Sequence, residues 1–145
     1  MYYPDLSPCP DGILPFGDDL PMLCVGWLDE NHSYTQGDVS TAFIERLWTF
    51  CCHPVFQTWG YHECPFCTEP SFGVKEQHGQ EKYSLGSAEI RVLGKGLVYA
   101  APNMIYHYVA HHHYSPPEEF IQAVLEGPLP GSPEYEAVQE ERDWE

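Results

Sequence analysis

The sequence predicts an α+β fold, with a small, mainly antiparallel sheet, about three packed helices and a zinc ion as a staple. Three observations predict it. Two β-prone runs meet at a Gly-Lys-Gly turn,. Apolar residues recur at helical spacing in separate segments. Cys64 and Cys67 lie three positions apart in a Pro-containing turn, and a histidine cluster follows about forty residues later, which is the pattern of a zinc site.

The length and composition indicate one domain. The chain has 145 residues, 43% of them hydrophobic, with 10 Tyr, 7 Phe and 4 Trp, which is enough to bury a core. We expect residues 1–131 to form a single zinc-binding α+β domain. Residues 132–145 are strongly acidic and are expected to form a C-terminal tail or a short helix,.

The first third of the chain is predicted to hold one strand and one helix. Residues 1–21 are rich in turn residues and predict an irregular arm,. Residues 22–28 form a short apolar run that is typical of a buried strand. A helix is expected over 39–52, because Asp38 is a good N-cap and Pro54 ends the pattern,.

The middle of the chain predicts a loop and then a hairpin. Residues 69–82 are polar and contain glycine, which indicates a surface loop,. Residues 87–93 and 96–101 are β-prone and flank Gly94 and Lys95, which predicts a β-hairpin,.

Two further helices are predicted after the hairpin. Pro102 takes the favoured first position of a helix that carries the histidine cluster,. Ser115 and Glu118 have the spacing of a capping box at the start of a helix over 116–126,. Gly127 can end that helix.

The net charge is −16, and this excludes some partners. Phosphate backbones and anionic lipids require clustered Lys and Arg, so nucleic-acid and membrane binding are not expected. A basic protein is the partner that an acidic surface favours. The sequence does not predict the oligomeric state.

The N-terminus predicts the compartment. It has no basic and apolar leader, and the chain has no apolar run of about 18 residues, so we expect neither a signal peptide nor a membrane span,. This favours a cytoplasmic protein. In that compartment the six cysteines should be thiols or metal ligands, and Cys51 and Cys52 are expected to face the core.

The proposed zinc ligands are two thiols and two imidazoles. Cys64 and Cys67 supply the thiols from one tight turn,. His107 and His111 are i and i+4 on a helix and project from one face. His107 and His112 are i and i+5, which works if the last helical turn widens before the Pro pair. The spacing leaves both choices open.

The two thiols and the nearby histidines also have alternative interpretations. The two thiols would form a redox pair if a helix began after them, but Pro70 and Gly73 follow and favour metal,. His62 is a further ligand, a residue that orients a ligand or an ordinary surface imidazole, and we favour the second of these roles. Three more histidines are expected in solvated loops: His32, His53 and His78.

The chain resembles a family of small, uncharacterised bacterial proteins. The resemblance rests on G-Y-H-x-C-x-x-C, then G-S-A-E-I-R-V, then H-Y-V-x-x-H-x-Y-x-P-P, and covers most of residues 22–126. It implies that the paired helix histidines are His107 and His112. It implies no activity.

Two functions follow from these observations. A closed zinc site suits a non-enzymatic interaction protein, such as an inhibitor or immunity-type protein that meets a basic partner. The alternative is a zinc hydrolase or deaminase-like enzyme, in which Glu63 acts beside an open metal position. The deaminase spacing H-x-E is not matched, because His62 and Glu63 are adjacent,.

Overall fold

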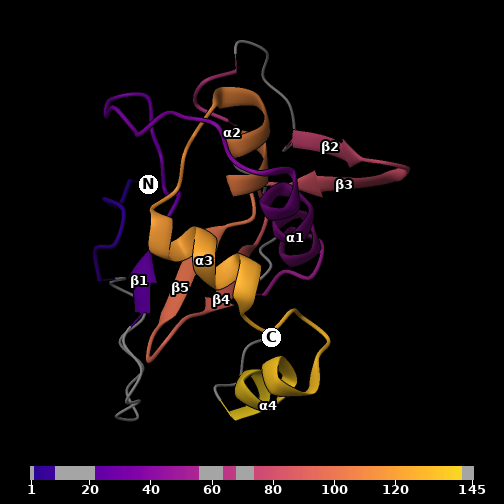
Figure 1. Cartoon of the computed structure of the whole chain (residues 1–145). Helices are drawn as coiled ribbons and strands as arrows, with labels where there is room; N and C mark the ends of the chain where they lie inside the picture. Colours follow the sequence, from indigo (N-terminus) through magenta and orange to yellow (C-terminus); the bar gives the residue numbers. More distant parts are fainter. Residues whose placement is uncertain (1, 9–21, 56–63, 68–73, 142–145) are drawn as a thin grey trace.

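A computed structural model describes residues 2–8, 22–55, 64–67 and 74–141, and it confirms the α+β class (Figure 1). Strands and helices alternate irregularly along the chain. Their order is β1 Met22–Cys24, α1 Thr41–Cys51, β2 Val74–His78, β3 Glu81–Leu85, β4 Glu89–Leu93, β5 Val98–Pro102, α2 Ile105–His112, α3 Glu118–Glu126 and α4 Pro133–Glu141.

The main sheet has the order β1-β5-β4. Strands β4 and β5 form the predicted hairpin, antiparallel with Ile90 opposite Ala101. Strand β1 adds to β5 in parallel, with Leu23 opposite Tyr99. All residues of β5 except Pro102 are buried, as expected for a central strand that is covered on both faces.

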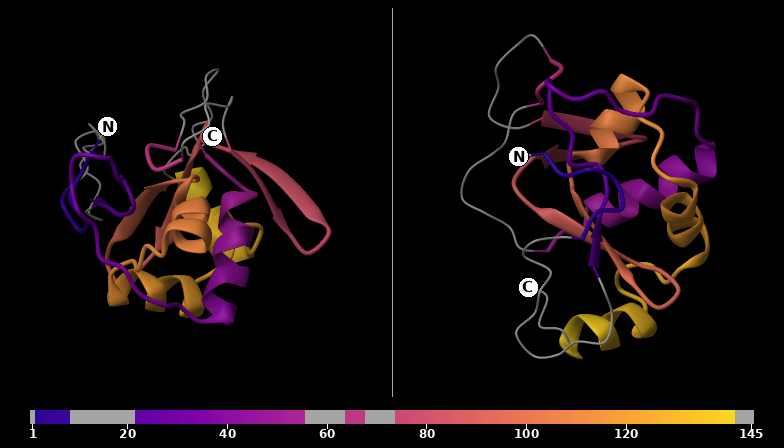
Figure 2. Two further views of the ribbon diagram at one scale, coloured as in Figure 1. Left: turned by 90° about the horizontal axis from the view of Figure 1, so that it is seen from above. Right: turned by 90° about the vertical axis from the view of Figure 1, so that its left-hand side faces the viewer.

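A second hairpin, β2–β3, lies where the sequence predicted a surface loop, so that prediction is wrong. The two strands are antiparallel: Val74 pairs with Leu85 at one end and His78 pairs with Glu81 at the other. Gly79 supplies the positive φ of 63° that the tight turn requires,. The hairpin extends away from the sheet and helices (Figures 1 and 2). Most residues of the two strands are polar, so this stretch lacks the apolar pattern that identifies a strand in a sequence,.

Helix α1 begins later than its predicted cap. Ser40, not Asp38, is the N-cap, and its hydroxyl accepts a hydrogen bond from the Phe43 backbone N–H at 3.1 Å. The helix buries one face made of Phe43, Leu47, Trp48, Phe50 and Cys51. This face packs against α2, α3 and β4, so α1 forms the centre of the helical layer.

Helices α2 and α3 also begin later than predicted. Pro102 ends β5 instead of opening a helix, and the Asn103 N–H donates to the Ala88 carbonyl. Helix α3 has Pro117 at its N-cap and no side-chain cap, so the predicted capping box does not form. Ser115 instead donates its backbone N–H to the Thr35 carbonyl, which ties the α2–α3 connection to the loop before α1.

Helix α4 is anchored through one aromatic residue. Tyr135 is buried and donates its hydroxyl to the Arg91 carbonyl on β4 at 3.0 Å. Its ring also contacts Phe50 of α1 edge-on. The segment after residue 132 is therefore helical through Glu141 and attached to the core.

The described cysteines include one in a disulfide and four free thiols. Cys24 is disulfide-bonded. The expectation that all six cysteines are thiols or metal ligands is therefore wrong. The described free thiols are Cys51, Cys52, Cys64 and Cys67, and Cys51 is buried as predicted. Within the described ranges, no helix has the length and apolar character to cross a membrane.

Candidate metal centre

The two thiols lie on one tight turn, residues 64–67, which we call the thiol turn. The Cys67 backbone N–H donates to the Cys64 carbonyl at 3.3 Å and closes the turn. Cys64 is buried and Cys67 is exposed. The turn therefore presents one sulfur from the protein interior and one from the surface.

The two imidazoles come from α2, whose last turn is wider than an ordinary α-turn. The His113 N–H donates to the Tyr108 carbonyl, five residues earlier, and His113 takes the left-handed conformation with φ 57°. Ordinary α-helical bonds span four residues, so this five-residue bond is of the π type. The wider turn brings His112 to the same side of α2 as His107, as the i, i+5 hypothesis requires.

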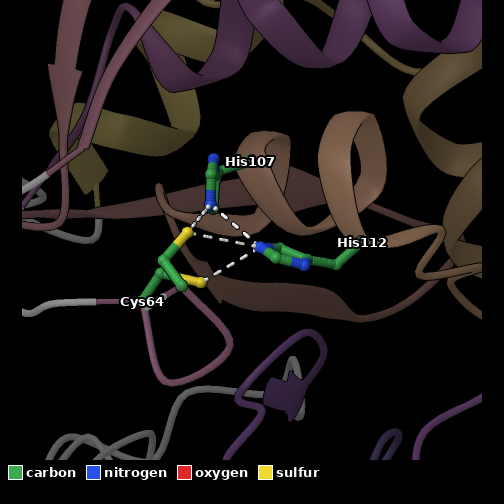
Figure 3. A group of neighbouring side chains, drawn as sticks. Cys64, His107 and His112 are labelled. Atoms are coloured by element: carbon green, nitrogen blue, oxygen red, sulfur yellow. Dashed lines mark hydrogen bonds between the residues drawn. The ribbon is translucent and has the colours of Figure 1, made fainter. Parts of the chain in front are cut away.

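The four side chains Cys64, Cys67, His107 and His112, here called the four-donor cluster, converge on one point. Figure 3 shows Cys64, His107 and His112 of this cluster pointing toward one another. All their donor atoms lie within 4.8 Å of one another. The two imidazole Nε2 atoms are 3.1 Å apart. Cys64 Sγ lies 3.4 Å from His112 Nε2, and Cys67 Sγ lies 3.2 Å from His107 Nε2 and 3.6 Å from His112 Nε2.

These separations match the edges of a metal-centred tetrahedron. Bonds of about 2.3 Å to sulfur and about 2.0 Å to nitrogen, at the tetrahedral angle, give edges of about 3.3 Å between nitrogens and about 3.5 Å between sulfur and nitrogen. The observed edges of 3.1 to 3.6 Å bracket those values. The cluster can therefore hold a metal ion, and two sulfur plus two nitrogen donors suit zinc.

A carboxylate on the β2–β3 hairpin supports the histidines. Glu76 of β2 is buried, and its Oε1 lies 2.5 Å from His107 Nδ1. Its Oε2 lies 2.9 Å from His111 Nε2. Glu76 was not predicted as a site residue, because it lay within the predicted loop. Gly79, a turn residue between two five-residue segments that prove to be strands, was the sequence feature that could have predicted the hairpin.

Burial and neighbouring charges shift the pKa values at this site. Burial raises the pKa of the Cys64 thiol to about 11. Burial also opposes ionisation of Glu76, but the bonds from His107 and His111 outweigh it and hold the Glu76 pKa below its ordinary value. Burial, followed by the charges of His107 and His111, lowers the pKa of His112. Glu76 is thus held as the anion and His112 as the neutral imidazole, the form that binds metals.

Aromatic residues enclose the outer side of the cluster. Phe66, within the thiol turn, contacts the His112 ring at a centroid distance of 5.4 Å and the Tyr34 ring at 5.1 Å. Tyr34 donates its hydroxyl to the His112 carbonyl at 2.9 Å. Tyr34 therefore fixes the end of α2, and Phe66 packs beside the ring of a donor imidazole.

The remaining predicted residues fall elsewhere. His111 points to Glu76 and is not part of the four-donor cluster. His62 and Glu63 lie outside the described residues. His78 was expected in a solvated loop but lies on β2, half-buried, with its Nδ1 3.2 Å from the Tyr106 hydroxyl. His32 and His53 are exposed, as expected.

Comparison with known proteins gives one family match. A family model described as a domain of unknown function (DUF7919) matches residues 1–125. No curated protein and no solved structure matches the chain. The matched residues include the whole four-donor cluster and Glu76.

Proposed function

We propose that this chain, which belongs to the DUF7919 family, binds one Zn²⁺ through Cys64, Cys67, His107 and His112. The observation that carries the proposal is the tetrahedral spacing of the four donor atoms,. An S₂N₂ set also selects against magnesium and calcium, which prefer oxygen ligands.

The zinc has a structural role in this proposal. Four protein donors fill a tetrahedral site and leave no position for a catalytic water. The ion joins the thiol turn to α2, two segments about forty residues apart that the described backbone hydrogen bonds do not connect directly. Because the assembled site exists only in the folded chain, the free energy of zinc binding adds to the free energy of unfolding.

The partner in this proposal is a basic protein, met in an interaction, inhibitor or immunity-type role. The net charge of −16 supports it, since such a surface steers basic partners over long range. Helices α3 and α4 contribute many of the exposed acids: Glu118, Glu119, Glu126, Glu134, Glu136, Glu140 and Glu141.

The alternative is a zinc hydrolase or deaminase-like enzyme. It requires that one of the four donors leave the metal and that Glu63 act as a base near the open position. Cys67 is the donor best placed to leave, because it is exposed. A water oxygen in the zinc coordination shell would favour this enzyme over the structural role.

Two measurements test the proposed function. Elemental analysis of protein purified without added metal should give one zinc per chain. A pull-down with the wild type should return a basic protein whose binding weakens with salt, and a variant with the α3 and α4 glutamates changed to glutamine should return less. Absence of zinc contradicts the metal site, whereas absence of a basic protein contradicts only the interaction role.

The compartment and the source stay predictions. A cytoplasmic location was expected from the N-terminus, and the disulfide at Cys24 counts against it, because disulfides persist mainly in oxidising compartments. The resemblance to small bacterial proteins is likewise an inference from the motifs.

A further inference from the structure

Glu76 is a buried acid that stands outside the four-donor cluster and yet bonds to it. It lies on β2, 31 residues before His107, and is almost fully shielded from solvent, with 7% of its surface exposed. Both of its oxygens face imidazole nitrogens of α2. A buried carboxylate costs free energy unless donors satisfy it, so this arrangement needs a reason beyond packing.

The bond between Glu76 and His107 determines which nitrogen of His107 can bind metal. An ionised carboxylate only accepts hydrogen bonds, so His107 Nδ1 must carry the proton that it donates to Oε1. In a neutral imidazole the other nitrogen then has a free lone pair. That nitrogen, Nε2, is the atom that lies 3.2 Å from Cys67 Sγ and 3.1 Å from His112 Nε2.

We propose that Glu76 is the positioning residue of the metal centre: it holds His107 in the Nδ1–H tautomer with Nε2 aimed at the metal, and His111 is the tether that fixes Glu76. This inference rests on the proposed function. Glu76 does not touch the ion. It acts through His107, by orienting the ring and by making it a stronger donor.

His111 belongs to this support and not to the ligands. Its Nε2 donates to Glu76 Oε2 at 2.9 Å, and its side chain is 55% exposed. With Oε1 engaged by His107 and Oε2 by His111, the carboxylate plane is held at two points. One face of α2 thus carries a ligand histidine and, four residues later, the histidine that secures its partner.

The Glu76 bonds also dock the β2–β3 hairpin. Other polar contacts also join the hairpin to the helices: His78 Nδ1 lies 3.2 Å from the Tyr106 hydroxyl, and Trp48 Nε1 donates to Glu81 Oε2 at 3.1 Å. Neither of these two contacts involves a proposed metal ligand, whereas Glu76 contacts His107 directly. The metal site and the position of the hairpin are therefore coupled through the Glu76 carboxylate.

Zinc affinity in Glu76→Gln tests the inference, with Glu81→Gln as the matched control. Glutamine keeps the size but replaces one acceptor oxygen with an NH₂ donor. Competition with a chromophoric chelator should show zinc binding weakened about 10- to 100-fold in Glu76→Gln, the usual effect of losing such a partner. Glu81→Gln removes a charge from the same hairpin on β3, but the remaining amide oxygen can still accept the hydrogen bond from Trp48 Nε1, so zinc affinity should match the wild type. His111→Gln should give a smaller loss than Glu76→Gln.

Spectroscopy separates positioning from a general loss of structure. Cobalt bound to Glu76→Gln should keep the visible absorption of a tetrahedral S₂N₂ site, because all four ligands remain. In zinc-loaded wild type, ¹⁵N NMR should show His107 with a protonated Nδ1 and a metal-bound Nε2, and this measurement requires no variant. Metal on His107 Nδ1, or unchanged zinc affinity in Glu76→Gln, would overturn the inference. Wild type that binds no zinc would overturn the proposed function itself.

Discussion

The Nε2 atoms of His107 and His112 face each other at 3.1 Å, five positions apart on one helix. Glu76 Oε1 lies beside the other ring nitrogen of His107, Nδ1, and a hydrogen bond from Nδ1–H leaves the lone pair of a neutral imidazole on Nε2. Burial lowers the pKa of His112 and favours its neutral form. Two imidazole nitrogens and two sulfurs that converge in this way are stabilised by a cation at their centre, and the predictions below follow from that arrangement.

Loss of one thiol should remove the zinc and destabilise the fold. Cys64→Ser deletes a buried donor, and zinc in 1,000-fold excess over its Kd adds about 4 kcal/mol to the free energy of unfolding. For a chain of this size we expect the Tm of zinc-loaded protein to fall by about 8–16 °C. Calorimetry with elemental analysis measures both. Cys52→Ser is the control and should keep its zinc, because Cys52 lies outside the cluster.

Chelation should lower the Tm of the wild type but not that of the zinc-free variant. Removal of the ion takes away the same linkage free energy that Cys64→Ser loses. Differential scanning fluorimetry with and without a strong chelator makes this comparison. An equal Tm for wild type in both conditions would show that the ion contributes nothing to stability.

Zinc should protect Cys67 from alkylation. Cys67 is exposed, so its sulfur is accessible to a reagent, while Cys51 is buried and should stay unmodified in either state. A metal-bound thiolate reacts more slowly because its lone pairs are shared with the ion. Mass spectrometry after timed iodoacetamide treatment should show faster labelling of Cys67 in chelator than in zinc. Equal rates of Cys67 labelling in zinc and in chelator would show that Cys67 is not a metal ligand.

Tyr34→Phe should weaken zinc binding modestly. The change removes the hydrogen bond from the Tyr34 hydroxyl to the His112 carbonyl and keeps the ring that contacts Phe66. A bond of this kind contributes about 1 kcal/mol, so we expect about a fivefold higher Kd for zinc. Tyr99→Phe, which loses a hydrogen bond to Glu119 of α3 and involves no member of the cluster, is the matched control and should leave the Kd unchanged.

Zinc should slow hydrogen exchange in the β2–β3 hairpin. Glu76 connects β2 to His107, so fixing the His107 ring also restrains the strand. Exchange followed by mass spectrometry should show greater protection of residues 74–85 in zinc than in chelator. In Glu76→Gln this difference should shrink, while protection of α1 should change equally in both proteins. If zinc slowed hydrogen exchange of the hairpin as strongly in Glu76→Gln as in the wild type, Glu76 would not couple the hairpin to the metal site.

Local patterns predicted the elements whose own residues carry the signal. The β4–β5 hairpin follows from two β-prone runs around a glycine turn, and α1 follows from its buried face. Helix starts were less predictable: Ser40 replaced Asp38 as a cap, and Pro102 ended a strand. Pro102 pairs with Glu89 of β4, and the sequence around Pro102 does not contain this pairing.

The donors of the candidate site were predictable, but their support was not. Cysteine and histidine are common metal ligands, and their spacing in the sequence was typical of a metal site, so Cys64, Cys67, His107 and His112 could be predicted from the sequence. Their spacing left His111 and His112 equivalent, and only the π-type bond to Tyr108 shows how the later residue reaches the cluster. Glu76 could not be recognised as a site residue, because nothing in its neighbouring sequence distinguishes it from the other acids among the 22 Asp and Glu.

X-ray absorption at the zinc edge tests the central claim most directly. For protein purified without added metal, the account predicts one zinc per chain with two sulfurs at about 2.3 Å and two imidazole nitrogens at about 2.0 Å. A zinc-free protein that also fails to bind added zinc, or a shell of oxygen ligands, would contradict it.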